Sequence, residues 1–229
     1  MIALAGLQRI FQVGDQRVHA LRGLTLDLEP GDYVAIMGPS GSGKTTLLNL
    51  LGLLDHPDAG SYRFDGVETT TLNEEARARL RREKIGFVFQ SFHLIPRLTA
   101  FANVELPLVL AGLAPRERRP RVEKILDALG LAPRAGHRPD QLSGGQRQRV
   151  AIARATVMEP SLILADEPTG NLDRASGEEV IQILEALNDK GLILVLVTHD
   201  PALGARARRR IQMVDGAVVA DETAAGSCA

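Results

Sequence analysis

A glycine-rich segment at residues 38–45 fits the phosphate-loop pattern GxxxxGK followed by Ser or Thr, and it constrains the fold more than any other part of the chain. The apolar run Tyr33–Met37 before it predicts a buried strand, and the leucine-rich run Thr45–Leu54 after it predicts a buried helix. Strand, glycine-rich loop and helix in this order separate a nucleotide-binding loop from an ordinary glycine turn. The segment therefore predicts an α/β fold that binds a nucleoside triphosphate.

The residues of this loop suit the chemistry of phosphate binding. Glycine lets backbone N–H groups approach phosphate oxygens, and the following helix presents its positive N-terminal end to the same anion. The Lys44 ammonium can reach the β- and γ-phosphates, and the Thr45 hydroxyl can coordinate Mg²⁺. The residues expected to contact the nucleotide here are Gly38, Pro39, Ser40, Gly41, Ser42, Gly43, Lys44, Thr45 and Thr46.

Two carboxylates follow a second apolar run further along the chain. Leu162–Ala165 predicts a strand that carries Asp166 to the carboxyl edge of a parallel sheet, where folds of this kind bind ligands. Asp166 fits the role of organising Mg²⁺, and Glu167 fits the role of a general base that takes a proton from the attacking water. Without the phosphate loop, the same residues could be a strand end followed by a polar turn.

A third motif comes just before a helical pattern. Ser143, Gly144, Gly145 and Gln146 place a hydroxyl and exposed amide groups at the predicted start of a helix over Gln146–Val157. A hydroxyl and free amides at a helix N-terminus form an anion site, which here would be a second one. A simple helix cap is the alternative for this motif taken alone.

These motifs, together with His199 at the end of the run Ile193–Thr198, resemble those of the ATP-binding subunit of ABC-type ATPases, over about residues 1–220. The resemblance implies hydrolysis of ATP to ADP and phosphate, with ATP and Mg²⁺ as cofactors. It also implies a homodimer that holds two ATP molecules. In such a dimer Ser143 and Gly145 of one subunit would close on the ATP held by the phosphate loop of the other.

The same resemblance implies roles for single residues. Gln90, after the run Ile85–Phe89, would sense Mg²⁺ and the γ-phosphate, so that the metal ligands would be Thr45, Gln90 and Asp166. His199 would contact the γ-phosphate and hold Glu167, and Asp173 would lie in a loop that communicates between the two sites. Phe11 occupies the place where the family stacks an aromatic ring on adenine, although it could be a core residue. The expected catalytic residues are Glu167, His199 and Gln90.

The order of apolar runs predicts a P-loop NTPase core with a parallel sheet, within a single domain over residues 1–229. Short apolar stretches in residues 2–34 predict an N-terminal antiparallel sheet, and about residues 91–157 predict an inserted helical subdomain. About residues 222–229 read as a flexible tail. The predicted helices cover a capped segment at 71–84, then 106–113, 121–129, 146–157 and 176–187, and a hairpin joins 211–214 to 218–220.

The composition of the chain limits which binding partners and cellular locations are expected. The formal net charge is −1, so the charge balance does not call for nucleic acid, and no nucleic-acid partner is expected. No apolar run approaches the roughly 18 residues of a membrane span, and the N-terminus does not read as a signal peptide. The single cysteine, Cys228, suits a reducing compartment and reads as a thiol in a tail. The family resemblance implies a peripheral subunit on the cytoplasmic face of the inner (plasma) membrane, bound to an integral membrane permease that would supply the membrane spans.

Several strings narrow the resemblance to one bacterial branch. Residues 165–173, residues 92–99 and Asn103-Val104 resemble the group that serves macrolide export, lipoprotein release and the cell-division complex. The resemblance implies a permease with few spans and a large extracytoplasmic domain. It also implies that residues 91–104 dock a helix of that permease, although this apolar segment could be plain core.

Two other functions remain open at this point. The chain could be an ATP-gated scaffold in a cell-division membrane complex, as some relatives of this branch suggest. A soluble ABC ATPase that acts on nucleic acid or ribosomes would share the motifs. That class usually carries long insertions or two nucleotide domains in one chain, which 229 residues do not fit.

Overall fold

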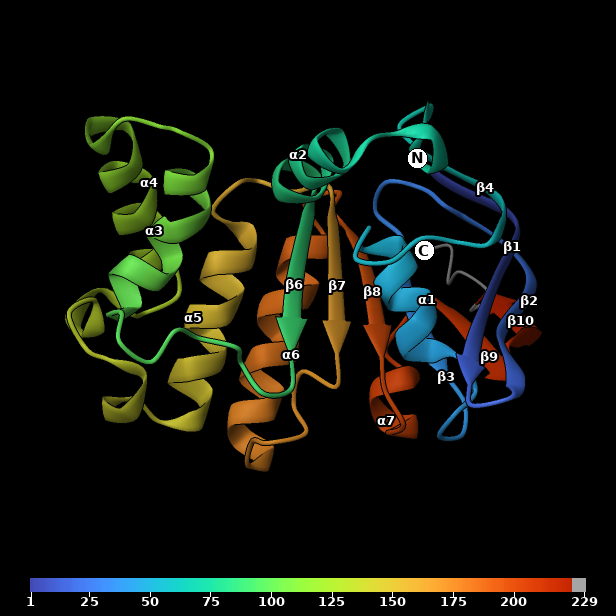
Figure 1. The fold of residues 1–229 in the computed structure, drawn as a ribbon. Coiled ribbons are helices and arrows are strands. Elements are labelled where there is room, and N and C mark those ends of the chain that lie inside the picture. Colours follow the sequence, from blue (N-terminus) through green and yellow to red (C-terminus); the bar gives the residue numbers. More distant parts are fainter. Residues whose placement is uncertain (224–229) are drawn as a thin grey trace. The chain divides into compact units, whose positions relative to one another are not determined.

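The computed structural model of the chain describes residues 1–223, and most of their helices and strands are labelled in Figure 1. These residues divide into two compact units. The first unit joins Met1–Arg79 to the chain from Asn188 onward, and the second unit is Leu80–Leu187. Helix α2 (Glu74–Lys84) begins in the first unit and ends in the second.

An antiparallel sheet forms the N-terminal part of the first unit, as predicted. Its strand order is β2-β1-β4-β5. Strands β1 (Ile2–Val13) and β2 (Gln16–Leu28) form a long hairpin, and β4 (Ala59–Phe64) and β5 (Val67–Glu68) extend it. Gly14-Asp15 is the turn, so the short apolar stretches of the sequence belong to two continuous strands.

A second sheet in this unit has the order β10-β9-β3-β8. The fully buried strand β8 (Ile193–Val197) and strand β9 (Arg209–Val214) run parallel to β3 (Tyr33–Met37). The predicted terminal hairpin is confirmed by β10 (Ala217–Thr223), which pairs antiparallel with β9. The α-helices that lie wholly in this unit are α1 (Lys44–Leu51) and the short α7 (Pro201–Gly204).

The C-terminal tail predicted at about residues 222–229 requires a correction at its start. Strand β10 runs through Thr223, and Glu222 pairs there with Arg210 of β9. The remaining tail residues 224–229, with Cys228, lie outside the residues that the structure describes.

The second unit contains two parallel strands, β6 (Ile85–Phe89) and β7 (Leu162–Asp166), and the predicted helical block between them. Its helices are α3 (Ala100–Leu110), α4 (Pro115–Ala128) and α5 (Gly144–Thr156), and α6 (Arg174–Asn188) follows β7. The buried core of the helical block consists of Ala100, Val104, Leu108, Val122, Leu126, Leu131, Leu142, Val150, Ala153 and Val157. This core explains why α3, α4 and α5 form one packed group.

Three helix starts differ most from the sequence prediction, whereas α1, α5 and α6 begin only one or two residues before their predicted starts. Helix α3 begins at Ala100 rather than at 106, because the Thr99 hydroxyl oxygen accepts a hydrogen bond from the Ala102 N–H at 3.2 Å and caps the helix. Helix α4 begins at Pro115 rather than at 121. The cap of α2 is Asn73, which accepts from the Ala76 N–H at 2.9 Å, and not Thr71, whose hydroxyl donates to the Glu68 carbonyl.

Of the helices within residues 1–223, none is both long enough and apolar enough to cross a membrane.

Candidate nucleotide site

The loop between β3 and α1 requires glycine at two points. Gly38 and Gly43 have φ angles of 148° and 98°, which side-chain-bearing residues rarely adopt. A Cβ at Gly43 would also collide with the Ala20 carbonyl oxygen, and a Cβ at Gly38 with the Met213 carbonyl oxygen. The loop can therefore follow this path only with glycine at both positions.

The start of α1 is built to receive an anion. Gly43 provides no side-chain cap, and the first turn contains no acidic residue. The first amide groups of a helix have no intrahelical acceptor, so they and the helix dipole attract negative charge here. The Lys44 Nζ donates to the carbonyl oxygens of Gly38 and Pro39, each at 2.8 Å. An ammonium has three donors, which leaves one for a phosphate.

A pocket of about 520 Å³ opens beside this loop within the first unit. Phe11 is 37% exposed and lines the pocket, so the alternative that it is a core residue is wrong. Of the loop residues named from the sequence, Ser40, Gly41, Gly43, Lys44, Thr45 and Thr46 line the pocket. No sequence pattern points to the other lining residues, which the fold brings here: Arg17, Val18, His19, Ala20, Arg22 and Asp215.

The three loop residues that do not line the pocket stabilise the conformation of the loop. Gly38 and Pro39 hold the Lys44 ammonium with their carbonyl oxygens. Ser42 is only 2% exposed, and its carbonyl oxygen accepts from the Gly216 N–H at 3.0 Å. Ser42 therefore fixes the loop to the turn of the terminal hairpin.

His199 lies at the same sheet edge as the phosphate loop. Strands β3 and β8 are parallel neighbours with Ile36 opposite Val197, and the Thr198 N–H donates to the Ile36 carbonyl at 3.2 Å. His199 and the loop starting at Gly38 follow the carboxyl ends of these two strands. The first unit thus places His199 at the sheet edge where the phosphate loop begins.

In the second unit, Gln90 and Asp166 lie at one sheet edge. Phe89 is opposite Asp166 in the register of β6 and β7, so Gln90 follows the same edge. The Gln90 Nε2 donates to the Asn171 Oδ1 at 3.3 Å, and the Asn171 Nδ2 donates to the Gln90 carbonyl at 3.1 Å. Gln90 is therefore in direct contact with the loop that contains Asp173.

Glu167 has a strained backbone. Its φ of 45° lies in the left-handed region, which non-glycine residues seldom occupy and which occurs often at active sites. The Gly170 N–H donates to the Glu167 carbonyl at 3.1 Å and closes the turn. The fully buried Gln148 donates from Nε2 to the carbonyls of Pro168 at 2.7 Å and of Phe89 at 3.3 Å. Gln148, which we did not predict, joins the turn after β7 to the end of β6.

Ser143 and Gln146 cap helix α5. The Ser143 hydroxyl oxygen accepts from the Gln146 N–H at 3.2 Å, and the Gln146 side chain accepts from the Ser143 N–H at 3.0 Å. The capping alternative from the sequence is therefore present, and it is compatible with a second role toward an anion, because the other first-turn amides stay available.

The two glycines after Ser143 are packed closely within the second unit. A Cβ at Gly145 would lie 3.0 Å from the Ser176 Oγ, and one at Gly144 would lie 3.2 Å from the Leu172 Cδ2. Asp173 holds Ser176 by accepting from its hydroxyl at 2.7 Å and from its N–H at 3.0 Å. These two hydrogen bonds from Ser176, the amide bond first, lower the pKa of the Asp173 carboxyl. The signature segment and the Asp173 loop thus pack against each other.

The segment after Gln90 is exposed at its start and buried at its end. Phe92 and His93 have left-handed backbones, and the Arg154 guanidinium donates to both of their carbonyls, at 3.0 and 2.6 Å. Ile95 is 39% exposed, whereas Asn103 is fully buried and bonds the backbone of residues 95–99. The end of residues 91–104 is therefore part of the core, as the alternative interpretation expected, whereas the start of this segment is exposed.

Within residues 1–223, no group of three or more His, Cys, Asp or Glu side chains could hold a metal ion by itself.

A phosphate loop between a parallel strand and a helix, beside a pocket that contains an aromatic ring, defines a P-loop nucleotide-binding protein. The profile of the family described as "ABC transporter" matches residues 21–170, and the chain belongs to this family. The family prediction and the predicted α/β P-loop fold are thus confirmed.

Curated relatives indicate which branch of the ABC transporter family the chain resembles. A macrolide export ATP-binding/permease protein, MacB, from Rhodopseudomonas palustris strain HaA2 is 55% identical over 96% of the chain, and one from Marinobacter nauticus is 52% identical over 96%. The chain spans about a third of the length of these relatives, 34% in each case.

A solved structure covers the chain more fully. The ATP-binding cassette MJ0796, in a dimeric post-hydrolysis state bound to ADP and Pi, superposes with a TM-score of 0.90 at 44% identity. The match covers 99% of this chain and 100% of that one. The chain is therefore an ABC transporter cassette that binds and hydrolyses ATP, as the motifs predicted.

Proposed function

We propose that the chain binds ATP with its phosphates on the loop at residues 38–45 and its adenine on Phe11. The observation that carries this proposal is the pocket of the first unit, because one pocket is lined both by Phe11 and by Lys44 and Thr45. An exposed aromatic ring suits a base, and the free N-terminus of α1 suits phosphates. The ADP- and Pi-bound state of the MJ0796 cassette supports the same use of the fold.

Mg²⁺ fits the donor set of the chain. The proposed ligands Thr45, Gln90 and Asp166 all offer oxygen, which Mg²⁺ prefers. Asp166 is the one carboxylate among them, and Mg²⁺ is usually bound by one or two carboxylates together with substrate phosphates. When bound, Mg²⁺ would neutralise charge on the β- and γ-phosphate oxygens.

Three residues are proposed to carry out hydrolysis. Glu167 accepts a proton from the attacking water, His199 contacts the γ-phosphate and holds Glu167, and Gln90 senses the γ-phosphate. Two observations support fixed positions for two of them. The turn of Glu167 is closed by Gly170 and held at Pro168 by Gln148, and Gln90 is bonded to Asn171.

The proposed active form is a homodimer with two ATP molecules. Ser143, Gly144, Gly145 and Gln146 of one subunit would complete the ATP site of the other, and Asp173 would connect the two sites. The free amides at the start of α5 and the dimeric state of the MJ0796 cassette support this arrangement.

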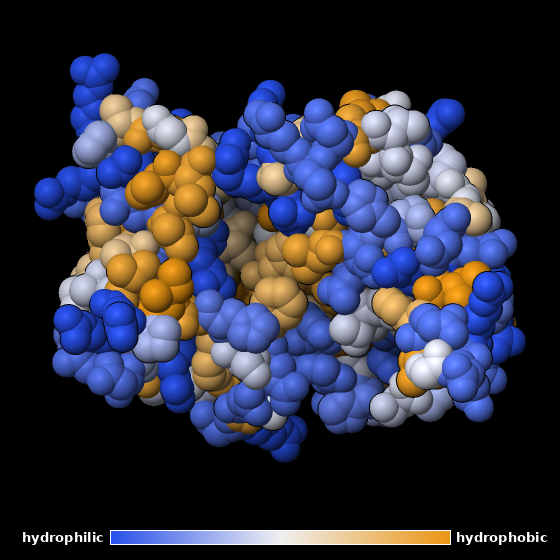
Figure 2. Space-filling view, in the orientation of Figure 1, coloured by the Kyte–Doolittle hydropathy of each residue, from blue (hydrophilic) through white to orange (hydrophobic). Residues whose placement is uncertain are grey.

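The proposed partner is an integral membrane permease of the macrolide-export type, with few spans and a large extracytoplasmic domain. The names of the relatives support a permease, whether it lies on a separate chain or in another part of the same polypeptide. Figure 2 shows hydrophobic residues gathered over α3 and α4. Val109 and Leu110 at the end of α3, and Ile95 before its start, are exposed large hydrophobic residues of the second unit. We propose that the exposed start of residues 91–104 docks a permease helix at the cytoplasmic face of the inner membrane.

Affinity capture of tagged Glu167→Gln protein from detergent-solubilised membranes, with ATP and Mg²⁺, tests this function. Loss of the general base should cut hydrolysis on the order of 100-fold or more and keep ATP bound. A stoichiometric permease with a large extracytoplasmic domain would support transport or force transmission. If Glu167→Gln turns over ATP at the normal rate, Glu167 is not the base.

Two other outcomes would favour the alternatives. Capture of a division complex by a chain that binds ATP without turnover would favour the ATP-gated scaffold. Capture of ribosomes or nucleic acid without any membrane protein would favour the soluble ABC ATPase. Lys44→Ala is the control, because a partner that depends on bound ATP should be lost with it.

A further inference from the structure

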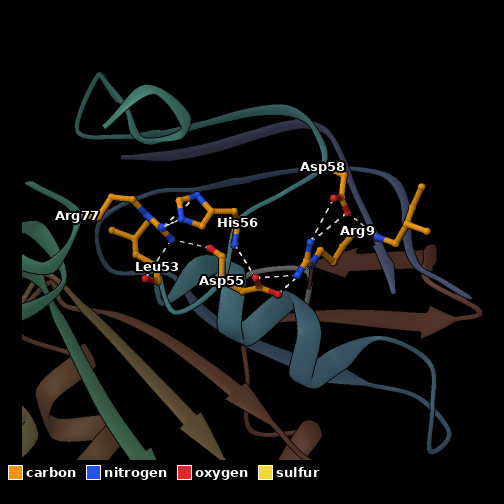
Figure 3. A network of polar contacts seen from close by, with 7 residues as sticks. Arg9, Leu53, Asp55, His56, Asp58 and Arg77 are labelled. Atoms are coloured by element: carbon orange, nitrogen blue, oxygen red, sulfur yellow. Dashed lines mark hydrogen bonds and ion pairs between the residues drawn. The ribbon is translucent and has the colours of Figure 1, made fainter. Parts of the chain in front are cut away.

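An arginine beside the nucleotide pocket is fixed by two carboxylates. The Arg9 Nε and Nη2 donate to the two oxygens of Asp55 at 2.8 and 2.9 Å, and Nη1 donates to Asp58 at 3.2 and 3.3 Å. Figure 3 shows these contacts on both sides of the guanidinium. The Arg9 side chain is only 20% exposed. Because the bonds to Asp55 form a planar fork, the guanidinium has one defined orientation.

The carboxylates that hold Arg9 are themselves held. Asp58 accepts from the Ile10 N–H at 2.7 Å, and the Asp55 carbonyl accepts from the buried Arg77 at 2.6 Å. Arg77 also donates to the Leu53 carbonyl at 3.2 Å, as Figure 3 shows. The clamp therefore joins strand β1 to the segment that follows α1, the helix that starts at the phosphate loop.

One face of the Arg9 guanidinium lies against the ring of Phe11. The Arg9 Cζ is 4.7 Å from the ring centroid, which is a cation–π contact. The guanidinium edges are occupied by two carboxylates, so its charge is neutralised locally and it is poorly suited to bind phosphate. The other contact of the Arg9 guanidinium is with the Phe11 ring, which is exposed and lines the pocket.

We propose that Arg9, clamped by Asp55 and Asp58, is a positioning residue that backs one face of the Phe11 ring and so presents the other face to the base of the nucleotide. This inference rests on the proposed stacking of adenine on Phe11. Arg9 acts through Phe11 and contributes nothing to the phosphates. Without the Arg9 side chain, the Phe11 ring can take up other orientations. Binding of the base must then fix the ring in one orientation, which costs free energy.

Calorimetric titration of the full chain with ATP and with inorganic tripolyphosphate, both in EDTA to prevent hydrolysis, tests the proposal. Ordering one side chain on binding costs enough to raise the Kd for ATP about threefold to tenfold in Arg9→Met. The Kd for tripolyphosphate, which has no base, should not change. Arg9→Lys should resemble Arg9→Met, because lysine has neither the planar fork nor a flat face to stack.

A double-substitution cycle with Phe11→Ala separates positioning from a general structural role. In the Phe11→Ala background, Arg9→Met should have no further effect on ATP binding. Arg63→Met is the matched control, since Arg63 also lies in the antiparallel sheet and pairs with a carboxylate, Glu68 at 3.6 Å, away from the pocket. It should leave both Kd values unchanged.

The outcomes distinguish this inference from the function on which it rests. If Phe11→Ala leaves ATP binding unchanged, the proposed stacking of adenine fails. If Phe11→Ala weakens ATP binding but Arg9→Met does not, or if the two effects add, Arg9 does not act through Phe11. An equal loss of tripolyphosphate binding in Arg9→Met would show that the substitution disturbs the phosphate loop instead and would overturn the proposal.

Discussion

Substitution of Gly145 by alanine should destabilise the subunit even when no nucleotide is bound. The added Cβ would lie 3.0 Å from the Ser176 Oγ and 3.1 Å from the Ser176 Cβ. Optimal contacts between carbon atoms are about 3.5–4.0 Å, so Ser176 would have to move. Ser176 resists this movement because its hydroxyl and its N–H both bond the Asp173 carboxylate.

The size of the effect follows from two opposing contributions. Overpacking a tight contact costs about 1–3 kcal/mol, whereas Gly→Ala inside a helix gains about 0.5–1 kcal/mol. The net loss for Gly145→Ala is therefore about 0–2.5 kcal/mol, centred near 1 kcal/mol. Each 1 kcal/mol lowers Tm by about 2–4 °C in a chain of this size. Urea and thermal unfolding of the nucleotide-free protein measure this loss of stability. Gly144→Ala is the matched control, because the atom closest to its Cβ is the movable end of Leu172 at 3.2 Å, and the Asn171 carbonyl oxygen is at an ordinary 3.8 Å.

A second substitution tests whether Ser176 is the cause. Ser176→Gly removes both close atoms and leaves the Ser176 Cα at 3.9 Å, an ordinary contact. The double variant should then be no less stable than Ser176→Gly alone. If Gly145→Ala keeps the full stability of the parent protein while its ATPase activity is lost, the packing argument is wrong, and the glycine serves the approach of nucleotide instead.

Three further predictions concern other parts of the chain. Lys44→Ala removes a charged donor worth about 1.5–3 kcal/mol, so titration with ATP should give a Kd about 10–100-fold higher; an unchanged Kd would contradict the phosphate-loop assignment. Ser143→Ala removes the cap of α5 and should lower stability by about 1 kcal/mol, whereas Ser143→Asn should keep most of it, as thermal unfolding can measure. Burial raises the pKa of Glu68, but hydrogen bonds, the largest from the Ser61 and Thr70 hydroxyls, outweigh it and lower the pKa from 4.5 to about 2. The stability that Glu68 contributes should thus be complete above about pH 4.5 and disappear as the pH falls toward 2; an acid titration of unfolding that shows the same pH dependence in Glu68→Gln would refute this.

The nucleotide motifs and most strands could be predicted because their signals are local. The phosphate loop needs glycine for backbone reasons that appear in eight consecutive residues, and β3 and β8 are short apolar runs. The starts of α3 and α4 could not be placed in the same way. Pro107 and Pro120 lie inside these helices, although proline is expected at a helix start. The packed core of the helical block outweighs that local preference.

The surroundings of the site could not be predicted because they depend on contacts between distant residues. Arg9 meets Asp55 and Asp58 across 46 and 49 positions of the sequence, and Gln148 meets Phe89 across 59. None of these residues belongs to a pattern with fixed spacing. Phe11 could be named from a family resemblance, but the guanidinium behind its ring could not.

Gly43 and Gly145 look alike in the sequence, but the structure restricts them for different physical reasons. Gly43 has a φ of 98°, and a Cβ there would meet the backbone carbonyl of Ala20, which no side-chain change can remove. Gly145 lies inside a helix, and the atoms closest to its added Cβ belong to a side chain. A second substitution can therefore rescue alanine at 145 but not at 43. The test compares the stability of two double variants: Gly145→Ala combined with Ser176→Gly, and Gly43→Ala combined with Ala20→Gly. Only the first double variant should recover stability, which would separate a restriction on side-chain size from a restriction on the backbone.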